Sequence, residues 1–511
     1  MIPRRLAAVL FVGLSLLLVS AGGAQASGPT LTGAGSTWAA IALDQWRVDA
    51  ARQGLNINYQ AVGSTAGRQF YIIGQVDFAA SEIPFLPAEV QQLKSAHRSF
   101  QYLPDVAGGT ALMYNVKDAS GHEINNLRLS ANTIAKIFTG KITNWQNPAI
   151  EADNPGVRFP NQHLTPVIRS DGSGTTAKLA DWLAHMDPAD WNPFARQYSV
   201  TLPVQFWPNF PGAVAVRGSD GVANYVSNTS VGPGSIGYVE AGYVYEHSMV
   251  PAYIKNRSGN YAAPSSSNVA IALRHATLNP DLTQNLLGVY NAPEATAYPL
   301  ASYSYLITQT TGFDPAKGAV LGKWIIYIAC AGQKEAAPLG YSPLPPNLVK
   351  ADFQALARIP GAPKPPPLTP QGCPNPTITG AGYGGGHQTG GQGVSGGGTG
   401  NQVKPAANNG GGGGSTTPAT TTHSGGKTTG RTKTNAKSSG KTTVSSPLLP
   451  NAGVTITPLS AVEQAAVLKQ GVKEASAAVQ ASDSPLVLAE VVLVLLVAGP
   501  LVSLIARRRR S

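Results

Sequence analysis

Three short segments of the chain combine glycine with serine or threonine in a way that could bind an anion. One runs from Arg169 to Thr176 (RSDGSGTT), and the other two are 33-GAGSTW-38 and 63-GSTAG-67. Each follows an apolar run and precedes a helical pattern, so each would place hydroxyl and N–H groups at the N-terminus of a helix. The first N–H groups of a helix lack partners within it, and the helix dipole favours negative charge there.

A single turn of this kind is usually a structural helix cap, because Ser and Thr begin many helices. Three turns of one design in the same chain instead predict a site lined by N–H and O–H donors, which suits a small dehydrated oxyanion. Arg169 would add a permanently charged donor that can form two parallel hydrogen bonds. We therefore expect an anion receptor and not an enzyme.

Other motifs in the sequence do not indicate a catalytic, cofactor or metal site. The 33–38 segment lacks the third glycine and the acidic residue of a dinucleotide fingerprint, and the Gly-Lys-Thr matches at 426–428 and 440–442 lack the upstream glycine of a P-loop. The eight histidines are scattered without metal-ligand spacing. A Gly-x-Ser-x-Gly match at 393–397 lies in a glycine-rich stretch that could not strain a serine into a nucleophile. We expect no cofactor and no metal.

The elements that must position these turns alternate along the chain from about Thr30 to Pro360. Such alternation favours α/β architecture with mainly parallel sheets, and the length of this region favours two lobes. The expected strands include Ile57–Val62, Val76–Ala80, Thr110–Asn115, Leu164–Ile168 and Ser235–Val239. The expected helices include Trp38–Ala51, Asn132–Phe138, Thr176–His185 and Ala319–Ala331.

The net charge of +11 belongs mostly to the two ends of the 511-residue chain. Residues 378–511 contain twelve Lys and Arg but four Asp and Glu, and Arg4 and Arg5 lie near the start. The middle of the chain is therefore close to neutral. A basic surface is what a nucleic acid would require, so we expect no nucleic-acid partner.

The N-terminus has the pattern of a secretory signal peptide. Arg4 and Arg5 precede the apolar run Leu6–Val19, and Ala24-Gln25-Ala26 fits a cleavage site. We predict a signal peptide over residues 1–26 and a folded part outside the cytoplasm.

The C-terminus has the pattern of a membrane anchor. Residues 485–506 contain one charge, Glu490, and are long enough to span a bilayer. The arginines of the tail, residues 507–511, favour the cytoplasmic side. We expect a single-pass protein of the cell membrane with its binding domain outside; a buried core helix is the alternative for 485–506.

Between the folded part and this anchor, the composition predicts a flexible linker. Residues 361–457 are rich in Pro, Gly, Ser and Thr, and such sequences bury too little apolar surface to fold. Residues 458–484 have helical propensity and would form a juxtamembrane segment. Two cysteines, Cys330 and Cys373, suit an exported chain, and we favour a disulfide between them over two inert thiols.

Four blocks of sequence occur in an order that points to one family. They are LTGAGSTW, VGSTAG…VDFAASEIP, IFTGKITNW…NPGVRFP…VIRSDGSGTT and PGSIGYVE. Together they resemble the phosphate-binding protein of the high-affinity phosphate ABC importer, over roughly residues 30–355. The resemblance implies a two-lobed periplasmic-binding-protein-like fold of type II that closes on its ligand by a hinge motion. It also implies a monomeric binding domain, residues 27–360, with lobe I at about 27–103 and 297–360 and lobe II at about 104–296.

The resemblance further implies a set of residues that would bind inorganic phosphate. In lobe I these are Thr37, the N–H of Trp38, Ser64 and Glu82; in lobe II they are Arg169, Ser173, Gly174 and Thr175. Asp171 matches the residue that holds the arginine in place. Glu82 departs from the family, which has an aspartate that accepts the proton of the phosphate.

A carboxylate at position 82 would separate phosphate from sulfate. Phosphate near neutral pH carries a P–OH group and sulfate has none, so an acceptor-only side chain binds the first and repels the second. Glutamate keeps the charge and adds one methylene, which leaves another tetrahedral oxyanion as an alternative ligand. An exposed loop position is the structural alternative for Glu82.

The expected function is an extracellular receptor that delivers phosphate to an ABC permease while tethered to the membrane near it. Two alternatives belong to other classes. A surface phosphatase could use the same cradle of donors, and a non-transport adhesin or phosphate sensor could use the same tether.

Overall fold

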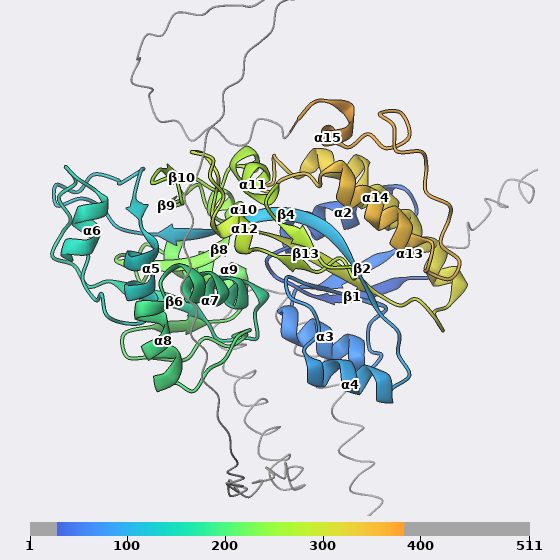
Figure 1. Ribbon diagram of the computed structural model, residues 1–511, viewed down its shortest axis with the longest axis horizontal. Coiled ribbons are helices and arrows are strands. Elements are labelled where there is room, and N and C mark those ends of the chain that lie inside the picture. The colour runs from blue at the N-terminus through green and yellow to red at the C-terminus, as the bar shows by residue number, and fades with distance from the viewer. Residues whose placement is uncertain (1–27, 383–511) are drawn as a thin grey trace, which may run out of the picture. The chain divides into compact units, whose positions relative to one another are not determined.

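The computed structural model describes residues 28–382, and these form a mixed eight-stranded sheet with helices around it (Figure 1). Its strand order is β2-β1-β3-β13-β4-β8-β6-β7. The strands are β1 (Leu31–Gly35), β2 (Ile57–Gln60), β3 (Phe78–Ser81), β4 (Gln101–Tyr114), β6 (Thr165–Arg169), β7 (Val214–Val216), β8 (Ser235–Glu240) and β13 (Ala301–Thr308). Two small sheets lie beside it, made of β5 (Arg128–Leu129), β9 (Tyr253–Lys255) and β10 (Tyr261–Ala262), and of β11 (Thr277–Leu278) and β12 (Gln284–Asn285).

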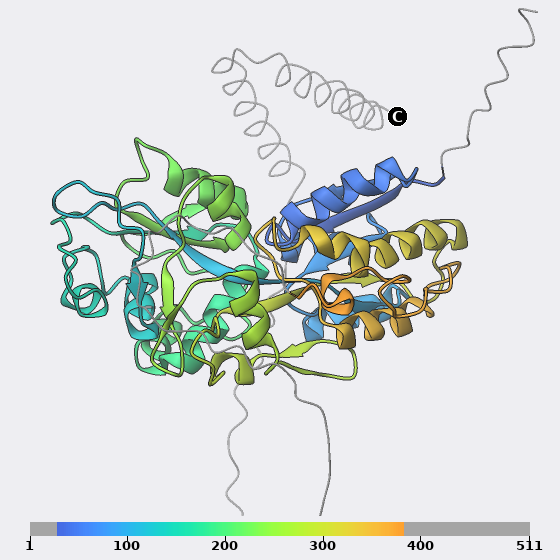
Figure 2. The same ribbon diagram turned by 90° about the horizontal axis from the view of Figure 1, so that it is seen from above.

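The long strand β4 joins two lobes. Residues 101–109 pair antiparallel with β13, and residues 110–114 pair antiparallel with β8. On one side of β4, strands β1, β2 and β3 are parallel and make lobe I together with β13; on the other side, β6, β7 and β8 are parallel and make lobe II. Figures 1 and 2 show β4 running from one half of the molecule into the other. The expected two-lobed α/β fold is confirmed, but the sheet is parallel only towards its ends.

Helices cover both lobes. Those beside the strands of lobe I are α2 (Ala40–Arg52), α3 (Ser64–Ile72), α4 (Pro87–Ser95), α13 (Pro315–Ala329), α14 (Pro346–Leu356) and the short α15 (Pro376–Thr379), with a 3-10 turn at Ala331–Glu335. Those of lobe II are α5 (Ala131–Phe138), α6 (Pro148–Asp153), α7 (Gly174–Met186), α8 (Pro188–Gln197), α9 (Gly218–Ser227), α10 (Ala241–Glu246), α11 (Ser266–Leu273) and α12 (Leu287–Tyr290).

Each lobe has its own aromatic core, which keeps the lobe rigid. In lobe I, the Phe78 and Trp324 rings lie 5.1 Å apart, and Trp46 is fully buried beside them. In lobe II, Phe138 lies 5.5 Å from Tyr238, which is also fully buried. Aromatic side chains bury large areas and prefer tilted or edge-to-face contacts. These two cores therefore hold in place the strands and helices that bear the site residues.

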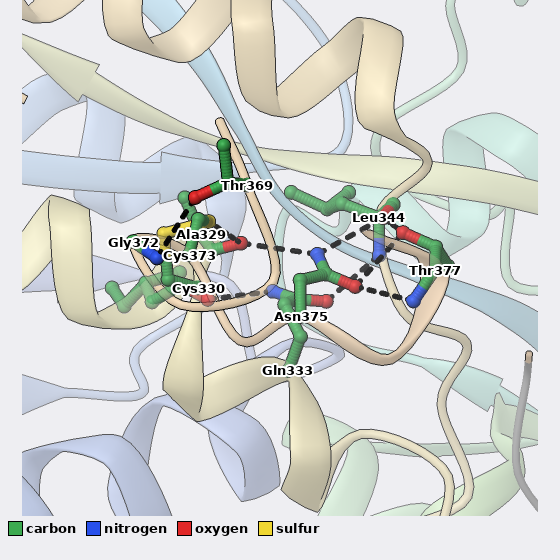
Figure 3. The surroundings of a disulfide bond; sticks show 10 residues. Ala329, Cys330, Gln333, Leu344, Thr369, Gly372, Cys373, Asn375 and Thr377 are labelled. Atoms are coloured by element: carbon green, nitrogen blue, oxygen red, sulfur yellow. Dashed lines mark hydrogen bonds between the residues drawn. A yellow bond between two sulfur atoms is a disulfide. The ribbon is translucent and has the colours of Figure 1, made fainter. Parts of the chain in front are cut away.

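The chain after Pro360 differs from the predicted linker. Residues 361–382 pack on lobe I as a strap, and a disulfide joins Cys373 of this strap to Cys330 at the end of α13 (Figure 3). Asn375 is fully buried and donates to the carbonyl oxygens of Ala329 (3.0 Å) and Leu344 (3.1 Å). A proline-rich segment needs no core of its own when a covalent bond and buried hydrogen bonds hold it on a neighbouring one.

Four predicted segments lie outside the described residues: the signal peptide, the rest of the linker, the juxtamembrane segment and the membrane helix at 485–506. Within residues 28–382, no helix is both long and apolar enough to cross a membrane.

Candidate functional site

The three glycine- and hydroxyl-rich turns all follow the carboxyl ends of parallel strands. The first joins β1 to α2, the second joins β2 to α3, and the third joins β6 to α7. Glu82 follows the end of β3 in the same way. In α/β folds, ligands bind at this edge of a parallel sheet because loops and helix N-termini gather there.

The structure brings the sequence-predicted residues together where the two lobes meet, and it buries them. No side chain of this set is more than 3% exposed: Thr37, Trp38, Ser64, Glu82, Arg169, Ser173 and Thr175. Gly174 is buried as well. Buried polar groups require hydrogen-bond partners, so their contacts define what the site offers.

The turn after β6 forms as its sequence dictates. Ser173 is the N-cap of α7, and its hydroxyl accepts a hydrogen bond from the N–H of Thr176 (3.1 Å). Gly174 and Thr175 then form the first turn of the helix, whose N–H groups have no partner within the helix. The N-terminus of α7 thereby faces lobe I, since the N–H of Gly174 donates to the hydroxyl of Ser64 (3.2 Å).

Arg169 is held by Asp171 through two hydrogen bonds. Its Nε donates to Oδ1 (2.6 Å) and its Nη2 donates to Oδ2 (2.5 Å). Burial raises the pKa of Asp171, but the hydrogen bonds and charge of Arg169 outweigh it and leave this pKa below the ordinary value. The bidentate pair fixes the guanidinium plane and leaves Nη1 to donate elsewhere, to the hydroxyl of Ser219 (3.3 Å).

Glu82 acts as an acceptor in the structure. Its Oε2 accepts from Ser64 (2.7 Å), and its Oε1 accepts from the hydroxyl of Ser36. A β carbon added to Gly174 would lie 2.0 Å from Glu82 Oε2, so this carboxylate reaches the α7 N-terminus of the other lobe. The exposed-loop alternative for Glu82 is therefore wrong, since the residue is 1% exposed.

Several residues of the site were missed by the sequence reasoning. The hydroxyl of Ser219, in the first turn of α9, lies 2.9 Å from the hydroxyl of Thr37, and the N–H of Ser219 donates to Thr37 Oγ1 (3.2 Å). The segment 214-VAVRGSDG-221 has the same strand, Gly-Ser turn and helix order as the other three, and this signal could have identified it. Ser36 adjoins Thr37 in a quoted motif, but nothing in that motif pairs it with Glu82.

Lys178 adds a cation that the motifs do not reveal. It lies one turn beyond Gly174 on α7. Burial lowers the pKa of Lys178 to about 8, while the charges of Asp181 and Glu82 act in the opposite direction.

Chemically, the arrangement offers two helix N-termini, several hydroxyls and one guanidinium as donors, and one carboxylate as an acceptor. Donors from the α3 and α7 turns meet across the lobes, and the acceptor Glu82 lies between them. Such a set fits a small oxyanion that carries both unprotonated oxygens and an acidic proton. Among the described residues, no three His, Cys, Asp or Glu side chains are grouped closely enough to hold a metal ion.

Comparisons with known proteins identify the family of the chain. A model of the PBP superfamily domain matches residues 20–331. The phosphate-binding protein PstS of Xylella fastidiosa (strain 9a5c) is 32% identical over 321 residues, which cover 63% of this chain and 83% of that protein. The phosphate-binding protein PstS of Pasteurella multocida (strain Pm70) is 30% identical over 322 residues, with 63% and 88% covered.

A solved structure shares the fold. The high-affinity periplasmic phosphate-binding protein PfluDING, determined with phosphate bound, superposes with a TM-score of 0.50 and 19% identity. The match covers 63% of this chain and 92% of that chain. At this identity the likeness bears on the fold alone.

Proposed function

Because the chain belongs to the PstS family of phosphate-binding proteins, within the PBP superfamily, we propose that it is a receptor, and not an enzyme, that captures inorganic phosphate outside the cytoplasm. It then delivers the phosphate to an ABC-type importer in the membrane. The observation that carries the proposal is the meeting of the α3 and α7 N-termini around Glu82, with Arg169 held beside them by Asp171.

Each group in this set has a role in binding phosphate. When phosphate binds, the N–H groups of Trp38, Gly174 and Thr175 would donate to its oxygens, together with the hydroxyls of Thr37, Ser64, Ser173 and Thr175. Ser64 and Gly174 would then exchange their present hydrogen bonds, to Glu82 and to Ser64 respectively, for bonds to phosphate. Arg169 adds a charged donor whose guanidinium plane is held in place by Asp171. Glu82 accepts the hydrogen bond of the P–OH group, which sulfate cannot form.

The proposal includes export and tethering. A signal peptide at residues 1–26 and a membrane helix at 485–506 are supported by their sequence patterns. A flexible linker between strap and helix would keep the binding domain near its permease at high effective concentration. Deleting residues 485–511 should release the protein into the medium; retention of the truncated protein in the membrane fraction would exclude this anchor.

Equilibrium binding of labelled phosphate, with and without excess sulfate, tests the function directly. We expect saturable binding at or below about 100 μM, which corresponds to roughly −5.5 kcal/mol, and little competition by sulfate. Ser173→Ala should weaken binding, while Ser227→Ala at the half-buried C-terminal end of α9 should leave it unchanged. Absence of saturable binding would refute the proposal. Stronger binding of another tetrahedral oxyanion would identify that anion, and not phosphate, as the ligand.

A further inference from the structure

Gln205 lies between α8 and β7 of lobe II and contacts lobe I outside the proposed phosphate site. Its side-chain carbonyl accepts hydrogen bonds from Thr65 Oγ1 (2.6 Å) and from Arg68 Nη2. Both donors belong to α3, the helix that begins at Ser64. These hydrogen bonds link the lobes, so they exist only while the lobes are together.

Arg68 is fixed within lobe I before it reaches Gln205. The side chain is fully buried; its Nε donates to Glu89 Oε2 (3.0 Å) and its Nη1 donates to Ser81 Oγ (3.1 Å). Glu89 is itself held, because it accepts the N–H of Leu86 (2.7 Å) at the start of α4. The charge of this arginine is therefore neutralised inside the lobe, and its Nη2 group extends to Gln205.

The backbone at Gln205 is fixed within lobe II. The neighbouring Val204 and Trp207 are each 4% exposed and belong to the core of lobe II. The indole N–H of Trp207 donates to the carbonyl oxygen of Phe138 (3.2 Å). The backbone carbonyl of Gln205 accepts the N–H of Ser173 (2.9 Å), the N-cap of α7.

We propose that Gln205 is a positioning residue that keeps the two lobes closed over phosphate. Its side chain is bound by the helix that begins with Ser64, and its backbone is bound to Ser173, so one residue connects the two anion-binding turns. Hydrogen bonds from charged donors are stronger than neutral ones, and this contact forms only after closure. Its loss should therefore act mainly on phosphate dissociation. The inference rests on the proposed function.

Stopped-flow measurement of phosphate binding to the full chain tests this role. Gln205→Ala should raise the dissociation rate by roughly 10- to 100-fold, the range expected for a hydrogen bond to a charged group. The association rate should change by less than about threefold, since mutational effects on affinity fall mostly on dissociation. Gln146→Ala, an exposed glutamine of the same lobe, is the matched control and should change neither rate.

A double-mutant cycle separates the contact from a general loss of structure. Thr65→Val keeps the shape of the side chain and removes the hydroxyl donor to Gln205. If the two residues act through one contact, the effects of Thr65→Val and Gln205→Ala on the dissociation rate are less than additive. Additive effects, or equal changes in both rate constants, would overturn the proposal.

The distance between the lobes gives a readout that does not depend on phosphate binding. Spin labels at Gln92→Cys on α4 and Asn192→Cys on α8 would report it, since these exposed positions lie on different lobes (Figure 1). We expect Gln205→Ala to shift the distance distribution towards longer values, with or without inorganic phosphate. Identical distributions in both conditions would refute the role of Gln205. Failure of the unmodified chain to bind phosphate would instead refute the proposed function.

Discussion

The carboxylate of Glu82 lies directly against the α carbon of Gly174, across the boundary between the lobes. A β carbon built at Gly174 would be 2.0 Å from Glu82 Oε2 and 2.9 Å from Ser64 Oγ. The side chain of Glu82, which is one methylene longer than the aspartate of the family, thus reaches the N-terminus of α7 in the opposite lobe. A side chain at position 174 would therefore have to displace Glu82 and Ser64, which are buried and hydrogen-bonded to each other.

Gly174→Ala should therefore impair phosphate binding. Overpacking of this kind costs about 1–3 kcal/mol, which corresponds to roughly 5- to 150-fold in affinity. Gly221→Ala is the matched control, because it is also in a lobe II helix and its added methyl would contact only Val216 Cβ at 3.8 Å. Isothermal titration of both variants with phosphate checks the prediction; equal affinities would contradict it.

Glu82→Gln should weaken phosphate binding and reduce the discrimination against sulfate. The amide keeps one neutral acceptor oxygen and replaces the other by a donor, so the P–OH group has a weaker acceptor while a fully unprotonated oxyanion gains a donor. We expect phosphate affinity to fall by roughly 10- to 100-fold. Competition titrations measure the change, with Glu151→Gln on the exposed face of α6 as a control. A variant with unchanged selectivity would exclude Glu82 from ligand recognition.

Ser219→Ala should lower phosphate affinity although Ser219 lies outside the ligand set implied by the family. Its hydroxyl contacts both Thr37 Oγ1 and Arg169 Nη1, so its removal takes one hydrogen-bond partner from each of these two proposed ligands. The loss of these two buried hydrogen bonds, one neutral and one from the charged guanidinium, predicts a decrease of about 3- to 30-fold. Ser227→Ala, at the half-buried C-terminal end of the same helix, serves as the control in the same titration. Unchanged affinity of Ser219→Ala would show that Thr37 and Arg169 are held by other contacts.

Local sequence determined much of the site. The sequence Arg169-Ser-Asp171 brings a guanidinium and a carboxylate within reach of each other at the end of one strand, and the glycines and hydroxyls that follow favour a helix N-terminus. These relationships depend on residues close together in the chain. Ser219 and Gln205 lie far from their partners in sequence, so local patterns could not predict their contacts.

The central strand shows why the rest of the fold was harder to predict. The strand predicted there covers Thr110–Asn115, and the stretch before it contains Pro104, Gly108 and Gly109, residues that usually weaken or end a strand. In the structure β4 continues through them. A β carbon at Gly108 would lie 2.7 Å from the ring of Trp38, so this glycine allows a close approach that only the folded chain contains.

Removing the disulfide should destabilise lobe I. Replacing both Cys330 and Cys373 by alanine removes the covalent link between the strap and α13. It also opens the loop that the disulfide closes in the unfolded chain, so the unfolded state gains conformational entropy. We expect the free energy of unfolding to fall by about 2–4 kcal/mol. Thermal or denaturant unfolding measures this, with Gln371→Ala on the exposed part of the strap as the control. An unchanged midpoint would mean that Asn375 and its hydrogen bonds hold the strap without the covalent bond.

Stability should fall as pH rises from about 4 to 8, and Asp105 on β4 should account for part of the decrease. Its side chain is fully buried, and its Oδ1 accepts the N–H of Val106 (2.8 Å). Burial raises the pKa of Asp105 from 3.8 to about 8, although this hydrogen bond partly opposes the shift. Between these two values the folded protein retains a proton that the unfolded chain has released. A single group of this kind lowers the free energy of unfolding by at most about 1.4 kcal/mol per pH unit.

Asp105→Asn should flatten this dependence, because the amide keeps a neutral polar group and has no proton to lose. The variant should be more stable than the unmodified protein at pH 8 and similar to it near pH 4. Burial also raises the pKa of Asp352 and of Glu240. The free energy of unfolding of the variant should therefore still fall with rising pH, but less steeply. Urea unfolding across this pH range measures the slope, and the exposed Glu151→Gln should leave it unchanged. If Asp105→Asn has the full slope of the unmodified protein, Asp105 is already ionised in the folded state and another carboxyl group retains the proton.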